Sequence, residues 1–202
     1  MTIDGKHAQS EAPDGLDSGV FTTQRLEAFS DAVIAVIITI IVLETKVPTH
    51  ELSDIEGLRR VFPTLVIYAL SFVQIGNYWV NHHYLVNDVR RATHGLLWAN
   101  LGFLFTLSLI PFATTWVGER GITSFAISLY SLCCALPAFS WMVLSRFSGR
   151  PRDTLPPNGW ARQITSSSLY LGALPVSRYS PLGALFMVAA GAVLWLFPAH
   201  RT

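Results

Sequence analysis

The chain has 202 residues, of which 51% are apolar and only 13% are charged, and its formal net charge is +1. Soluble domains carry about 25% charged residues, and a chain of this length keeps a large fraction of its surface exposed. This composition excludes an ordinary soluble domain, and the scattered basic residues form no face suited to nucleic acid. The sequence therefore predicts an all-α integral membrane protein.

Residues 1–21 are polar, rich in Asp, Gly and Ser, and contain no apolar stretch. A secretory signal needs a basic start followed by a short apolar region, which this segment lacks. Such a composition is typical of a disordered tail. We expect a disordered cytoplasmic tail over residues 1–21 and a six-helix transmembrane domain over residues 22–200.

Six apolar segments follow the tail. A membrane-spanning helix needs roughly 20 apolar residues, because each residue rises about 1.5 Å through a core about 30 Å thick. The expected helices are residues 26–45, 61–86, 95–117, 122–144, 164–176 and 181–198. The fifth is short and contains Pro175. We still expect it to span the membrane, because an odd number of helices would place the basic connector at 145–158 and the C-terminus on opposite sides of the membrane. The excess of Lys and Arg then favours both termini in the cytoplasm.

The first predicted helix has a continuous stripe on one face. At 100° per residue, a common face holds Arg25, Phe29, Ala32, Val36, Ile40 and Leu43, with Thr39 at its edge. One interpretation is that these aliphatic side chains only contact lipid or neighbouring helices. The other is that they serve a function of their own.

Asp31 lies near the start of the same helix. A carboxylate close to the membrane boundary is costly without a partner or water, so it is a functional candidate. The alternative is structural, with Ser30 and Asp31 bonding to a neighbouring helix. Arg25 and Asp31 are six residues apart, too far for the usual pair within one helix, so each is expected to reach another helix.

The second predicted helix carries the polar stripe Gln74, Asn77 and Asn81. Such a stripe indicates hydrogen bonds between helices or, alternatively, a ligand site. His82 and His83, with Asp88 and His94 nearby, raise the question of a metal site. Adjacent histidines point to different helix faces, which disfavours one. The chain has no phosphate-binding glycine loop, no HExxH motif and no TVGYG filter, so no enzyme or ordinary potassium filter is indicated.

The first helix also carries a recognisable motif. Arg25-Leu-Glu-Ala-Phe29-Ser30-Asp31 and the apolar run after it resemble the RxxxFSD signature and first helix of the transmembrane protein 175 family, specifically its prokaryotic single-repeat members. The segment Tyr78-Trp79-Val-Asn-His82-His83 and residues 100–112 are similar to that family's second and third helices. The resemblance covers residues 22–117 well.

The resemblance implies a potassium channel. It implies a cation channel weakly to moderately selective for K⁺ over Na⁺, formed by a homotetramer in the inner membrane of a prokaryote, with the first helices lining the pore. No cofactor is expected, and protons or other monovalent cations are further candidates for permeation. By position, the constriction is assigned to Val36, Ile40 and Leu43, and selectivity to Thr39. Val36 departs from the larger Ile or Leu common in the family.

The signature residues are expected to anchor the pore helix. The predicted network consists of Arg25, Phe29, Ser30, Asp31, Trp79, His82 and Asn100. Two alternatives to a channel stay open at the level of the sequence. One is a proton-coupled transporter that uses Asp31 and the histidines of the second helix. The other is a membrane-embedded enzyme or metal protein built on His82, His83 and Asp88.

Overall fold

The computed structural model describes residues 22–43, 53–87, 89, 92–149 and 159–196, and this part of the chain is entirely helical outside short turns. The helices are α1 (Thr23–Leu43), α2 (Asp54–Asn87), α3 (His94–Arg120), α4 (Ser124–Phe147), α5 (Gly159–Val176) and α6 (Pro181–Val193). The all-α prediction is confirmed. The predicted disordered tail, residues 1–21, lies outside the described residues.

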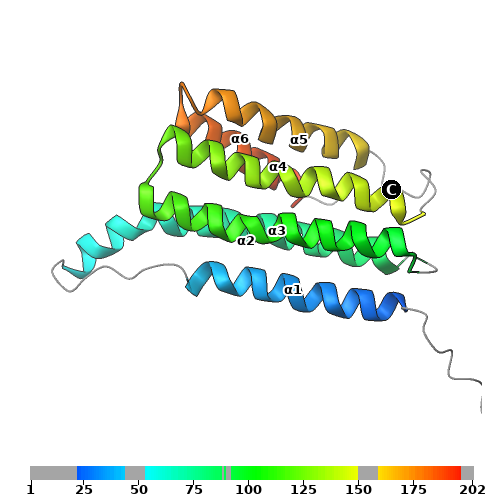
Figure 1. The fold of residues 1–202 in the computed structure, drawn as a ribbon. Helices are drawn as coiled ribbons and strands as arrows, with labels where there is room; N and C mark the ends of the chain where they lie inside the picture. The colour runs from blue at the N-terminus through cyan, green and yellow to red at the C-terminus, as the bar shows by residue number, and fades with distance from the viewer. Residues whose placement is uncertain (1–21, 44–52, 88, 90–91, 150–158, 197–202) are drawn as a thin grey trace, which may run out of the picture.

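The helices lie side by side with α1 at one edge of the bundle (Figure 1). α1 packs against α2 and α3, while α4, α5 and α6 form the opposite side. Two apolar cores result. One joins α1, α2 and α3 around Ile34, Ile75 and Phe103, and the other joins α2 to α6 around Tyr130 and Tyr170.

Helices α1 to α4 are each long and apolar enough to cross a membrane. The fifth and sixth predicted helices have different limits from those expected. α5 begins at Gly159, five residues before the predicted start, and α6 ends at Val193 instead of continuing to residue 198. With 13 residues, α6 is about 20 Å long, shorter than the other helices beside it.

The predicted start of α2 was also wrong. The helix begins at Asp54, seven residues before the predicted start, and has 34 residues, so Pro63 lies in its interior. The cause is a capping box: the Glu56 N–H donates to Ser53 Oγ at 3.4 Å, and the Ser53 N–H donates to the Glu56 carboxylate at 3.4 Å. The polar first turns of α2 extend past the ends of the neighbouring helices (Figure 1).

Candidate functional site

One face of α1 is exposed along the whole helix. Val36 is 55% exposed, Ile40 40% and Leu43 80%, and Thr39 lies exposed beside them. The Thr39 hydroxyl donates to the Val36 carbonyl at 3.0 Å, so its proton is used within the helix and its oxygen lone pairs face outward. The stripe expected from the sequence is therefore an outer surface of the single chain.

The opposite face of α1 is buried. Five side chains on it pack into the bundle: Leu26, Ser30, Ile34, Ile37 and Ile41. Their spacing of three and four residues makes one stripe that contacts α2 and α3. Aliphatic residues thus occupy both faces of α1, but only the inner set is used to hold the helix in the bundle.

A buried hydrogen-bonded chain links the first three helices near the N-terminal end of α1. Asn100 Nδ2 donates to Ser30 Oγ at 2.9 Å, and the Ser30 hydroxyl donates to the Leu26 carbonyl at 2.8 Å. The Asn100 side-chain oxygen lies 2.8 Å from His82 Nε2, and the His82 ring stacks on Phe103. Because an amide oxygen only accepts, His82 Nε2 carries the proton in this bond. The three helices are therefore tied together by side chains in the interior.

Two further contacts join α1 to α2 nearer the surface. Trp79 Nε1 donates to Asp31 Oδ1 at 2.9 Å, and His83 Nδ1 lies 2.8 Å from Glu27 Oε1. Glu27 and Asp31 are one helical turn apart, as are Trp79 and His83, so the antiparallel helices meet in two rungs. Asp31 thus has a partner at the membrane boundary, which reduces the cost of its charge.

The remaining signature residues lie on the outside. Arg25 is exposed in the first turn of α1, where its backbone N–H bonds Thr22 Oγ1. Phe29 is half exposed on the same face as Val36 and Ile40. The structure therefore brings together Ser30, Asp31 and their partners from α2 and α3, and it leaves Phe29 on the outer face of α1.

The histidines of α2 do not form a metal site in the described part of the chain. His82 is buried against Asn100, whereas His83 is half exposed and points to Glu27. No group of three His, Cys, Asp or Glu side chains gathers among the described residues. Asp88, the third candidate, lies outside them.

Sequence reasoning missed the contact between Glu27 and His83. The signal was present, because Glu27 precedes Asp31 by four residues and His83 follows Trp79 by four. To predict that Glu27 faces His83, one must also know how the antiparallel helices α1 and α2 align, and no pattern within a single helix gives that alignment.

The known proteins that this chain resembles are named as ion channels. A family model described as "Endosomal/lysosomal potassium channel TMEM175" matches residues 25–111. A protein named potassium channel HX13_20290, from Chryseobacterium sp. (strain P1-3), is 34% identical over 187 residues, which cover 89% of this chain and 95% of that relative. The human protein named "Endosomal/lysosomal proton channel TMEM175" is 35% identical over 96 residues, covering 43% of this chain and 18% of its own length.

A solved structure has a similar fold. It is the crystal structure of a lysosomal potassium-selective channel TMEM175 homolog from Chamaesiphon minutus, and it superposes with a TM-score of 0.73 at 26% sequence identity. The match covers 86% of this chain and 96% of the other. The similarity therefore extends from the N-terminal motif to the whole helical bundle.

Proposed function

Because the chain belongs to the TMEM175 potassium-channel family, we propose that it is a potassium-permeable cation channel whose pore is lined by the exposed face of α1. The family is one of channels and not of enzymes. The observation that carries the proposal is the division of α1 into a buried stripe and an equally apolar exposed stripe.

The proposed assembly is a homotetramer around the outer faces of four α1 helices. One chain presents a single such stripe, so several copies are needed to surround an axis. The tetramer sits in a prokaryotic inner membrane with both termini in the cytoplasm, as the distribution of Lys and Arg indicates. The mass of the complex in mild detergent tests this directly, because a clean monomer would exclude a symmetric pore.

The proposed constriction consists of Val36, Ile40 and Leu43 from each subunit. Rings of aliphatic side chains close a pore by expelling water and conduct when they widen. Since K⁺ holds its hydration water less tightly than Na⁺, an apolar neck favours K⁺ modestly. Thr39 adds an outward hydroxyl oxygen between these rings, which is why we assign it to selectivity.

We propose that hydrogen bonds fix the tilt of α1. These are the buried chain from Ser30 through Asn100 to His82 and the bond between Asp31 and Trp79. These bonds all lie on the inner side or flank of α1, away from the Val36 face. Their role is therefore to position the pore helix and not to contact the ion.

The direct test is conduction in planar bilayers. Replacing Ile40 with Asn makes the constriction wettable, and we expect basal cation leak to rise severalfold. Unchanged currents would contradict the pore assignment. Replacing Thr39 with Val keeps the shape and removes the hydroxyl, so the reversal potential under K⁺/Na⁺ gradients is expected to shift toward lower K⁺ preference.

Proton permeation is a second candidate function. It is favoured by the names of the vertebrate relatives, which are called proton channels. Reversal potentials measured under a pH gradient with K⁺ held equal on both sides distinguish the two ions. A transporter instead of a channel predicts saturable uptake at rates far below single-channel currents.

A further inference from the structure

Two further apolar faces lie beside the exposed face of α1. The first, the α2 face, consists of Phe62, Leu65, Ala69, Phe72 and Gly76, which alternate three and four residues apart. Its four side chains are exposed, and Gly76 between the turns is half-buried. This spacing of small and large apolar residues is typical of a helix that packs against another helix.

The second, the α3 face, consists of Trp98, Leu101, Phe105 and Phe112, spaced three, four and seven residues apart. All four side chains are exposed. The buried side chains of α3 lie on the other side of the helix and pack against α1, α2 and α4. The α3 face therefore points out of the bundle and carries three large aromatic rings.

α1 lies between these two faces. It packs against both α2 and α3, and Figure 1 shows α3 in front of α2 with α1 along the edge of the pair. Each face lies opposite the buried side of its own helix, so the α2 face and the α3 face point away from each other. The first three helices thus form a wedge with the exposed face of α1 at its tip.

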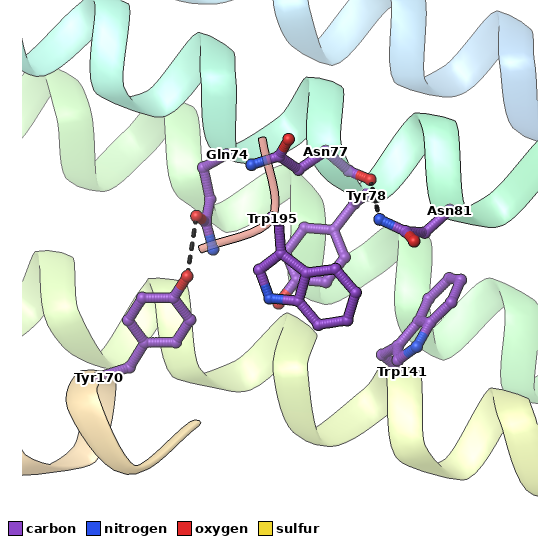
Figure 2. Close-up of a pocket in the computed structure, with 7 residues that line it drawn as sticks. All are labelled: Gln74, Asn77, Tyr78, Asn81, Trp141, Tyr170 and Trp195. Atoms are coloured by element: carbon purple, nitrogen blue, oxygen red, sulfur yellow. Dashed lines mark hydrogen bonds between the residues drawn. The ribbon is translucent and has the colours of Figure 1, made fainter. Parts of the chain in front are cut away.

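The polar side chains of α2 lie on a different side from the α2 face. Figure 2 shows Gln74, Asn77 and Asn81 directed toward α4, α5 and the turn after α6. Gln74 Oε1 accepts from the Tyr170 hydroxyl at 3.0 Å, and Asn77 Nδ2 donates to the Ala192 carbonyl at 2.9 Å. These bonds hold α2 to its own chain, so the α2 face is left for an apolar partner.

The two faces are complementary in size. The α2 face contains Ala69 and Gly76, and a Cβ added at Gly76 would meet nothing within 4 Å, so the space beside it is open. The α3 face projects Phe105 and Phe112, which are more than half exposed. Interfaces between membrane helices are enriched in small residues, because these let another helix approach closely. A protein partner with large side chains therefore fits the α2 face better than lipid.

Gly76 and Phe105 lie at the same height along the bundle. Within one chain, the rings of Tyr78 and Phe103 are in contact, with centroids 5.6 Å apart. Because α2 and α3 are antiparallel, one step along each helix from this contact leads to Gly76 on α2 and to Phe105 on α3. Both lie two residues, or about 3 Å, toward the same end of the bundle.

Ala69 and Phe112 also match in height. Thr64 lies against Gly118, since a Cβ added at Gly118 would approach Thr64 Cγ2 to 2.9 Å. Ala69 is five residues from Thr64 and Phe112 is six from Gly118, again in the same direction, so the two differ by less than about one turn of 5.4 Å. Rotation about an axis parallel to the helices does not change heights, so both matches hold between copies of the chain.

A ring of identical subunits requires two different faces that meet head to tail. We propose that the α2 face of one subunit packs against the α3 face of the next, with Phe105 beside Gly76 and Phe112 beside Ala69. This inference rests on the proposed tetramer, in which α1 surrounds the axis. The wedge shape places both faces next to the pore and leaves α4, α5 and α6 toward lipid.

Photo-crosslinking of the full-length protein in membranes tests this contact. With Phe105→p-benzoylphenylalanine, we expect ultraviolet light to join two subunits, and peptide mass spectrometry to locate the bond within residues 69–80 of the second subunit. The matched control is Phe139→p-benzoylphenylalanine on α4, because Phe139 is 66% exposed and Phe105 is 65% exposed. The control should form adducts with lipid and should not join subunits.

A second variant fills the space beside Gly76. Gly76→Phe should leave the helical content by circular dichroism unchanged, because its Cβ position is open within the chain. It should weaken the association of subunits by about fivefold or more, since the added ring occupies the place of Phe105 of the next subunit. Ala190→Phe adds the same ring at an exposed position of α6 and should assemble like the wild type.

Native mass spectrometry of the same samples separates the possible failures. If the wild type is a tetramer but Phe105→p-benzoylphenylalanine reacts only with lipid, this interface is wrong and the proposed pore is unaffected. The interface is equally overturned if Gly76→Phe assembles as well as Ala190→Phe does. A monomeric wild type would instead refute the proposed assembly itself, and this interface with it.

Discussion

Replacing Asn100 with Leu tests whether the buried chain of hydrogen bonds holds α1 in the bundle. Asn100 bonds Ser30 on α1 and His82 on α2 at once. After the change, Ser30 still donates to the Leu26 carbonyl, but His82 Nε2 loses its partner. His82 Nδ1 is already buried without a hydrogen bond, so neither ring nitrogen would then be paired.

The expected cost follows from these two losses. A buried donor left unpaired costs about 1–3 kcal/mol, and the lost bond to Ser30 contributes about 1 kcal/mol more. Side-chain hydrogen bonds between membrane helices average only about 0.6 kcal/mol, which favours the lower part of the range. We therefore expect Asn100→Leu to lower the free energy of unfolding by about 2–3 kcal/mol, the lower part of the summed range.

The assay is equilibrium unfolding in mixed micelles with a rising fraction of denaturing detergent, followed by circular dichroism. Ser108→Ala on the exposed side of α3 is the control and should change stability by less than about 0.5 kcal/mol. The double variant His82→Phe/Asn100→Leu removes the orphaned ring nitrogens and retains an aromatic ring beside Phe103. It should be more stable than Asn100→Leu alone. The reasoning is refuted if Asn100→Leu matches the wild type, or if the double variant is no more stable than Asn100→Leu.

Two other changes test contacts on either side of the bundle. Trp79→Phe removes the indole N–H that donates to Asp31, so it should lower the free energy of unfolding by about 0.5–1.5 kcal/mol and alter conductance in planar bilayers. Wild-type values for both measurements would show that this hydrogen bond does not position α1. Gly191→Ala would place a Cβ 2.5 Å from Tyr170 Cε1, so the buried Tyr170 ring must move, and the protein should lose about 1–3 kcal/mol in the same unfolding assay. Gly76→Ala, where a Cβ meets nothing within 4 Å, serves as the control.

The faces of α1 could be predicted from the sequence because a helix repeats every 3.6 residues. Val36, Ile40 and Leu43 were placed on one face by spacing alone, and the structure leaves that face exposed. Spacing did not reveal that Ile34, Ile37 and Ile41 form the buried side, because aliphatic residues cover both faces of α1. Periodicity divides such a helix into stripes, but only the packing of α2 and α3 shows which stripe is inside.

Helix ends were harder to predict than helix cores. Hydropathy follows the apolar part of α2, so it missed the polar turns that begin at Asp54 under the Ser53 to Glu56 capping box. The end of α6 was missed for the opposite reason, since the apolar run continues past Val193 while the backbone turns. Local hydrogen bonding, and not hydrophobicity, determines both limits.

The polar anchors of α1 have a mechanical consequence. Glu27, Ser30 and Asp31 all lie in its first three turns, while the inward side chains beyond them, from Ile34 to Ile41, are aliphatic. Hydrogen bonds fix direction and distance, whereas aliphatic contacts permit sliding, so the anchored end acts as a pivot. From Ser30 to Leu43 the lever arm is about 20 Å, and a rotation of about 5° would move its far end by about 1.7 Å. Small rotations about this pivot therefore displace Leu43 several times more than Phe29.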